Sequence, residues 1–321
     1  MSLASVRVRG DGIAAWCCAR LLSNSGFAVS IERPPARKRP WILVSDPAQR
    51  LLSDIAGDPD LFQNTPRIRN RTVRWGPRAE PVELEHSSAI VEEQEFLARL
   101  WPSIPETNGA ADWSIIAAPP VPTEQHHFGS RTAFVCDVDL NDAREACWVE
   151  SFEHGWLFLV AGTDTIGSLI AVGARPEVLL ESSRSVGRHV SAIREVQPEI
   201  AAYPRIASPM FGDGWLACGT AAMMLDPLCG DGCGHAVREA ILAAAVLRGG
   251  GAAGLLDHYQ SRLRLAFERH LSLCRNYYVS GCSGPWWEHE ISHLDRGLAW
   301  SRANAVKEWR YRLQGFDLIT L

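Results

Sequence analysis

The sequence predicts an α/β fold in which a Rossmann-like dinucleotide-binding domain carries an inserted antiparallel sheet and is followed by a helical C-terminal segment. Three observations lead to this expectation. Residues 5–32 show the patterns of a strand, a glycine turn, a helix and a second strand in that order. Short strand patterns follow one another from residue 132. Long helical patterns cover 235–247 and 255–278. Alternating strands and helices indicate a parallel sheet, whereas strands joined by short turns indicate an antiparallel one.

The boundaries between these parts follow the composition. The stretch Pro119-Pro120-Val121-Pro122 separates the first strand-and-helix region from the run of strands. The first domain is expected to be discontinuous, because the chain returns to it after the inserted strands. The expected division is 1–118 with 205–250 for the dinucleotide-binding domain, 119–204 for the inserted substrate-binding sheet domain, and 251–321 for the helical segment.

The composition excludes several classes of protein. The chain has 321 residues, of which 46% are hydrophobic and 21% charged, and a formal net charge of −5, so nucleic-acid binding is not expected. No apolar run is long enough to predict a membrane span. Because a strand pattern begins almost at once without a signal-peptide pattern, a cytoplasmic protein is expected. The nine cysteines lie mostly in apolar surroundings and fit no familiar zinc spacing, which predicts reduced thiols and no metal site.

A nucleotide-binding motif lies between the first two predicted strands. Gly10 makes the tight turn, Gly12 lets a pyrophosphate approach the backbone, and Ala15 lets the following helix pack close to the strand. Glu32 ends the second strand, where a carboxylate can accept from the ribose hydroxyls of an adenosine. The complete order of strand, glycine turn, helix, strand and acid favours a dinucleotide site over a βαβ unit without a ligand.

A second glycine-rich loop precedes the helical pattern at 235–247. Glycines at alternate positions let backbone amides approach a ligand closely, and a helix that begins near His235 offers its positive end to an anionic or electron-rich group. The preceding Asp226-Pro227 can accept from loop amides and stiffen the approach. A plain turn between a strand and a core helix is the alternative. The loop glycines are Gly230, Gly232 and Gly234.

Periodicity predicts the remaining elements. Apolar residues at helical spacing favour helices, and alternating or continuous apolar runs bounded by turns favour strands. The expected helices cover 13–23, 46–56, 91–101 and 176–192, and the expected strands cover 5–9, 27–31, 68–75, 111–117, 132–140, 146–152, 155–161 and 165–172.

Three segments carry a resemblance to a known family. They are VRGDGIAAWCCARLL (8–22), GWLFLVAGTDTIGSLIAV (155–172) and GDGWLACGTAAMMLDPLCGDGCGHAVREAI (212–241). In this order they resemble the flavin-dependent monooxygenase and tryptophan-halogenase superfamily. The sequence is most similar to the accessory flavoproteins that hydroxylate tryptophan during maturation of tryptophylquinone cofactors.

The resemblance implies FAD as the cofactor and a monooxygenase reaction in which a flavin hydroperoxide hydroxylates an aromatic substrate. That substrate would be a small molecule or a tryptophan in a peptide or protein, and the reductant would be external, either NAD(P)H or a flavin reductase. His235 and Pro227 would lie at the catalytic edge of the flavin. The residues expected to bind FAD are Gly10, Gly12, Ala15, Glu32, Gly219, Thr220, Asp226, Gly230, Gly232 and Gly234.

Four departures from the family leave other functions open. Gly219-Thr220 stands where the family has Gly-Asp, and the acidic pair Glu92-Glu93 replaces the Arg or Gln that often begins the third helix. The segment after that helix is short. The only two lysines, Lys38 and Lys307, do not match the position of a halogenase's catalytic lysine, so halogenation is disfavoured. The alternatives are a non-catalytic descendant that acts as a binding or assembly partner, and a flavin reductase or dehydrogenase of another substrate.

Overall fold

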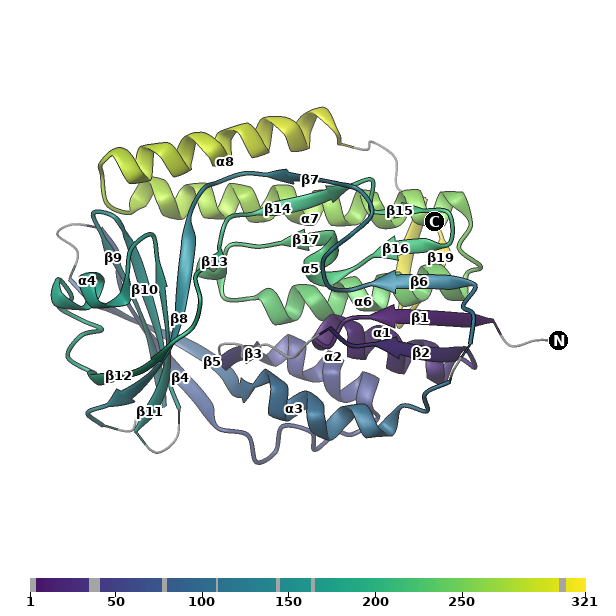
Figure 1. Ribbon diagram of the computed structural model, residues 1–321, viewed down its shortest axis with the longest axis horizontal. Helices are drawn as coiled ribbons and strands as arrows, with labels where there is room; N and C mark the ends of the chain where they lie inside the picture. The colour runs from purple at the N-terminus through teal and green to yellow at the C-terminus, as the bar shows by residue number, and fades with distance from the viewer. Residues whose placement is uncertain are drawn as a thin grey trace.

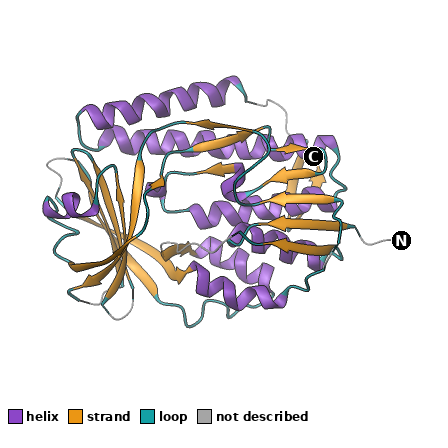
Figure 2. Cartoon of the chain, viewed as in Figure 1, coloured by secondary structure: helices purple, strands orange, loops and turns teal. Residues whose placement is uncertain are grey.

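The computed structural model describes residues 4–34, 41–76, 80–107, 109–142, 145–162, 165–305 and 310–321. Both lysines therefore lie outside the described residues. Two sheets stand side by side, a five-stranded sheet on the right in Figure 1 and a nine-stranded sheet on the left, with helices packed between and above them (Figures 1 and 2). The α/β architecture predicted from the sequence is confirmed.

The five-stranded sheet contains the predicted nucleotide-binding unit. Its central strand β1 (Ser5–Arg9) pairs in parallel with β2 (Ala28–Glu32) and with β6 (Trp113–Ile116). Helix α1 (Ile13–Asn24) connects β1 to β2, as expected for a βαβ crossover. Val6 and Val8 lie on the same face of β1 and are fully buried, whereas Arg7 on the opposite face is exposed. The sheet is completed by β16 (Trp215–Ala217) and β15 (Phe211–Gly212).

The nine-stranded sheet combines strands from both sides of residue 119. Strand β4 pairs in parallel with β9, and the other neighbours are antiparallel. The larger sheet thus joins the first third of the chain to the strands predicted after residue 131. Its members are β3 (Trp41–Ser45), β4 (Arg67–Arg74), β5 (Val82–Glu92), β8 (Thr132–Leu140), β9 (Ala146–Phe152), β10 (Gly155–Ala161), β11 (Ile166–Val172), β12 (Val190–Val196) and β13 (Ile200–Ala201).

Two predicted helices are wrong at their ends. Helix α4 covers only Pro176–Glu181, and the second half of the expected helix 176–192 is a loop followed by the start of β12. Glu150 explains the change, because its carboxylate accepts from the Ser183 hydroxyl and from the backbone amides of residues 184, 185 and 186. Residues 91–92 belong to strand β5 and not to the helix expected over 91–101.

The remaining elements are short pieces and the long C-terminal helices. Helices α7 and α8 run side by side along the top of the molecule in Figure 1, above α6. Among the described helices, none has a stretch long and apolar enough to cross a membrane. The elements are α2 (Asp46–Ala56), α3 (Glu93–Leu100), η1 (Trp101–Ser103), β7 (Glu124–His127), β14 (Arg205–Ser208), α5 (Gly219–Ala222), β17 (Met223–Met224), η2 (Pro227–Cys229), α6 (Gly232–Arg248), α7 (Ala253–Ser280), α8 (Pro285–Ala303), β18 (Tyr311–Gln314) and β19 (Asp317–Thr320).

Candidate functional site

A cavity of about 340 Å³ lies at the N-terminal end of α1. This volume falls at the lower end of the range of small-molecule sites. The start of α1, the residues after β6, helix α5 and the first turns of α6 converge on it. No arginine or lysine of the described chain lines it. Its lining includes Asp11, Gly12, Ala15, Glu93, Ala117, Gly219, Thr220, Gly232, His235 and Glu239.

The backbone below this cavity has the shape that a nucleotide-binding turn needs. Gly10 has φ +145°, which side-chain-bearing residues rarely adopt, and a Cβ there would lie 3.1 Å from the Cβ atoms of Ala15 and Ala117. Gly12 is the N-cap of α1 and supplies no side-chain cap, so the first amides of the helix face the cavity. The Gly10 N–H donates to the carbonyl of Glu32 (2.9 Å), which fixes the turn against the exposed end of β2.

A carboxylate holds the first amide of α1. The Ile13 N–H donates to Glu93 Oε1 at 3.2 Å, across 80 residues of sequence. This amide stands at the positive end of the α1 dipole, where a phosphate would bind in a dinucleotide site. Glu93 is thus an anionic group in the position expected for the pyrophosphate. Of the acidic pair Glu92-Glu93, only Glu93 lines this cavity.

A second carboxyl group faces the position of the missing aspartate. Gly219 begins α5 with φ +54°, and its N–H donates to Glu239 Oε2 at 2.9 Å. Burial raises the pKa of Glu239 to about 8, so this group carries a proton at neutral pH. The adjacent Thr220 hydroxyl donates to the Ala117 carbonyl at 3.4 Å. Helix α6 therefore supplies a carboxyl group to the cavity where the sequence offers only a threonine.

The glycine-rich loop leads into α6 along one wall of the cavity. Gly230 has φ +66° and is the C-cap residue that follows η2. Gly232 is the first residue of α6 and lines the cavity. Gly234 lies against the Asp231 side chain, since a Cβ there would meet Asp231 Oδ1 at 2.3 Å. His235 also lines the cavity. Burial, with the nearby Arg238, lowers the pKa of His235 to about 4, so its imidazole is neutral at pH 7.

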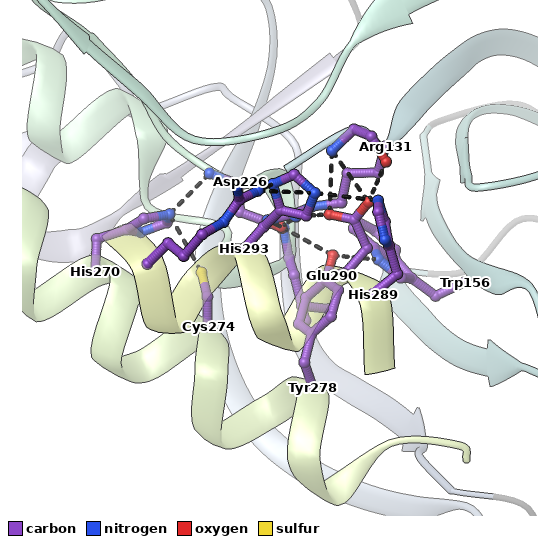
Figure 3. Close-up of polar contacts among 12 residues, drawn as sticks. Arg131, Trp156, Asp226, His270, Cys274, Tyr278, His289, Glu290 and His293 are labelled. Carbon is purple, nitrogen blue, oxygen red and sulfur yellow. Dashed lines mark hydrogen bonds and ion pairs between the residues drawn. The ribbon is translucent and has the colours of Figure 1, made fainter. Parts of the chain in front are cut away.

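Asp226 points into a buried ionic cluster and not into the cavity (Figure 3). One oxygen of its carboxylate accepts from Arg131 Nε at 2.8 Å and from the Tyr278 hydroxyl at 2.9 Å, while the other oxygen accepts from the Leu228 N–H. Arg131 also pairs with Glu290 of α8. The cluster fixes the loop that carries Pro227 to the two long helices, so Asp226 has a positioning role.

The sequence predicted several of the residues that line the cavity. Gly12, Ala15, Gly219, Thr220, Gly232 and His235 all line it, whereas Gly10, Glu32, Pro227, Gly230 and Gly234 are not among its lining residues. The sequence did not predict the roles of three polar groups, two of which lie in the cavity and one in the buried ionic cluster. These groups are Glu93 at the first amide of α1, Glu239 at the Gly219 amide, and Arg131 beside Asp226. The acidic pair at 92–93 and the Gly-Thr in place of Gly-Asp were the signals for the first two, and for Arg131 the sequence held no signal.

The Gly10 turn and the Glu239 carboxyl group are compatible with bound FAD, whereas the position of the Glu93 carboxylate opposes FAD binding. The Gly10 turn leaves room for a close approach, and the Glu239 carboxyl can accept from or donate to a ribityl hydroxyl. The Glu93 carboxylate must leave the Ile13 amide before a phosphate can take its place. The site is therefore suited to FAD once Glu93 has moved.

Comparisons with known proteins agree with this geometry. No protein-family model and no curated protein matches the chain. Solved structures match it over nearly its whole length. The peptidyl tryptophan dihydroxylase QhpG, essential for tryptophylquinone cofactor biogenesis, is 18% identical and superimposes with a TM-score of 0.73 over 100% of this chain and 86% of that one.

Two halogenases give similar values. The myxobacterial chondrochloren halogenase CndH is 16% identical, with a TM-score of 0.77 over 95% of this chain and 90% of that one. The flavin-dependent halogenase CmlS is 17% identical, with a TM-score of 0.74 over 94% and 70%. At these identities the likeness concerns the fold. The predicted resemblance is confirmed at that level: the chain has the fold of flavin-dependent halogenases and of a peptidyl tryptophan dihydroxylase.

Proposed function

We propose that this chain is an FAD-dependent monooxygenase that hydroxylates an aromatic substrate, such as a tryptophan side chain in a peptide or protein. The single observation that carries the proposal is the cavity in which the Gly10–Gly12 turn, helix α5 and the start of α6 converge. The fold likeness to a peptidyl tryptophan dihydroxylase supports the choice of substrate class. NAD(P)H or a flavin reductase would supply the electrons.

Bound FAD would supply the oxygen-activating redox chemistry, and the protein would supply position and field. Gly10 and Gly12 would let the diphosphate approach the α1 amides, and Glu32 would accept from the adenosine ribose. Glu239 would hold the ribityl chain in place of the carboxylate that Thr220 lacks. The α6 N-terminus at Gly232 would favour negative charge beside it.

His235 and Pro227, near the start of α6, would set the polarity around the reactive edge of the flavin. His235 is neutral at pH 7, so it can donate or accept a hydrogen bond without adding charge to the site. Pro227 removes one backbone donor, and Asp226, tied to Arg131, keeps the η2 turn in place. Their expected role is to shape and dry the space at the flavin edge.

A non-catalytic binding partner is the second candidate, because the Glu93 carboxylate stands at the phosphate position. One experiment separates the two. The purified chain is titrated with FAD, gel-filtered and examined by visible absorbance, and the loaded protein is then reduced without oxygen and mixed with oxygen and a tryptophan-containing peptide. Retained flavin and a peptide that gains one oxygen atom support the monooxygenase. A chain that retains no FAD, either as wild type or as Glu93→Gln, contradicts it.

A further inference from the structure

Two thiols and an imidazole lie together behind the η2 turn. Cys229 is the last residue of η2, and His270 and Cys274 are one turn apart on the buried face of α7. Cys229 Sγ lies 3.5 Å from Cys274 Sγ, and Cys274 Sγ lies 3.2 Å from His270 Nε2. Figure 3 shows His270 and Cys274 pointing from the same helix toward the Asp226 loop. The proposed monooxygenase reaction uses none of the three groups.

The arrangement gives the two thiols different access to solvent. Cys229 is partly exposed and lines a cavity between α6 and α7, whereas Cys274 is fully buried directly behind it. A disulfide needs its sulfur atoms about 2.05 Å apart, so the pair must close by about 1.5 Å. Cys229 ends a three-residue turn next to Gly230, which leaves that side free to adjust. A dissolved oxidant therefore meets Cys229 first, and Cys274 second.

The hydrogen bonds and pKa shifts also make Cys229 the more reactive of the two thiols. The Asp226 N–H donates to His270 Nε2 at 2.8 Å and occupies the lone pair of that nitrogen, so the Cys274 thiol proton is left to donate to Cys229 Sγ. The hydrogen bond with Cys274 lowers the pKa of the Cys229 thiol against the opposing effect of burial, and burial raises the pKa of Cys274. Thiolate character, which governs nucleophilicity, therefore belongs to the accessible cysteine.

The same three groups are also ligand types for a soft metal such as zinc. A metal would need the lone pair of His270 Nε2, which already accepts from the Asp226 amide. Asp226 is itself fixed by Arg131 and Tyr278, so that amide cannot turn away cheaply. This competition favours thiol chemistry over metal binding at the cluster.

We propose that Cys229 and Cys274 form a reversible intramolecular disulfide when the chain meets hydrogen peroxide. The Cys229 thiolate attacks a peroxide oxygen, the O–O bond breaks, hydroxide leaves and a sulfenic acid forms. The Cys274 sulfur then attacks the Cys229 sulfur; the S–S bond forms, the S–O bond breaks, and the Cys274 proton goes to the departing hydroxide, which leaves as water. Two thiols and one peroxide give one disulfide and two waters, and an added thiol reverses the change.

This disulfide would tie the loop at the flavin side of the molecule to helix α7. The inference rests on the geometry of the cluster and does not require that the chain bind FAD. The cysteine Cys282 offers a matched control, because it is also partly exposed but its sulfur faces the Ser151 hydroxyl at 3.6 Å and not a second thiol.

The test treats the reduced full chain with one equivalent of hydrogen peroxide and maps its cysteines by mass spectrometry. We expect a peptide pair linked through Cys229 and Cys274, lost on treatment with dithiothreitol, in the wild type and in Cys282→Ser. Cys274→Ser should stop at a sulfenic acid on residue 229 that dimedone traps, and Cys229→Ser should give neither product.

Three results would overturn the proposal. The first is a wild-type chain whose Cys229 and Cys274 stay reduced while peroxide is consumed elsewhere. The second is equal labelling of Cys282 and Cys229 by dimedone in the Cys274→Ser variant. The third is a purified chain that holds one equivalent of zinc and loses it in Cys229→Ser, since that outcome assigns the cluster to a metal.

Discussion

Replacing Glu93 by glutamine tests how the cavity selects its ligand. The glutamine keeps the size of the side chain and can still accept from the Ile13 N–H, but it removes the negative charge from the helix N-terminus. A diphosphate and a carboxylate cannot share this amide. We therefore expect Glu93→Gln to bind FAD more tightly than the wild type.

The size of the effect follows from two contributions. A hydrogen bond to a charged group contributes about 1.5–3 kcal/mol and a neutral one about 0.5–1.5 kcal/mol, so the amide is released about 1 kcal/mol more easily. Two unit charges about 6 Å apart at an effective dielectric constant of about 20 repel by about 3 kcal/mol, and less once the side chain has swung away. A gain of about 1–3 kcal/mol corresponds to a Kd lower by roughly 5- to 150-fold.

Flavin fluorescence titration at constant pH and low salt measures this change. Glu92→Gln is the matched control, because Glu92 is the neighbouring acid but does not line the cavity. The advantage of Glu93→Gln should shrink at high salt, which screens the repulsion. Equal FAD affinity for the wild type and both variants would refute the assignment of Glu93 to the phosphate position, although FAD binding itself would stand.

Three further outcomes are expected in denaturant titrations. Gly10→Ala should lower the free energy of unfolding by about 1–3 kcal/mol, because alanine meets both an unfavourable φ and a close contact, whereas Gly26→Ala meets only the φ; equal losses would contradict this. The raised pKa of Glu239 means that stability falls as pH rises from about 4.5 to about 8, and Glu239→Gln should flatten that slope. Arg131→Met leaves two buried carboxylates without their cation and should cost about 3–5 kcal/mol, against less than about 1 kcal/mol for the exposed Arg194→Met.

The elements that the sequence predicted correctly are those whose signal is local. The Gly10 turn, helix α1 and strand β2 lie within thirty residues, and the turn is closed by a backbone bond between Gly10 and Glu32. Strand β8 alternates, strand β10 is a continuous apolar run, and the apolar face of α7 repeats over its length. Such periodicity reflects the backbone itself and needs no knowledge of the distant partner.

The elements that the sequence missed depend on a partner far along the chain. Strand β5 is exposed on both faces over its first residues, and its pairing with β3 and β4 makes it a strand. Helix α4 ends early because the Glu150 carboxylate, from a distant strand, takes the next amides. The context of the sheet thus overrode the local preference.

The sequence by itself determined the glycine turn at Gly10 and the type of fold, and it predicted that this turn belongs to an FAD site. Only the tertiary structure decided which partners the buried charged groups meet: in the cavity Glu93 reaches Ile13 across 80 residues, and in the ionic cluster behind it Arg131 reaches Glu290 across 159. The reason is physical. Backbone geometry repeats locally and can be read from spacing, but the partner of a buried charge is chosen by the packing of elements that the chain brings together only when it folds.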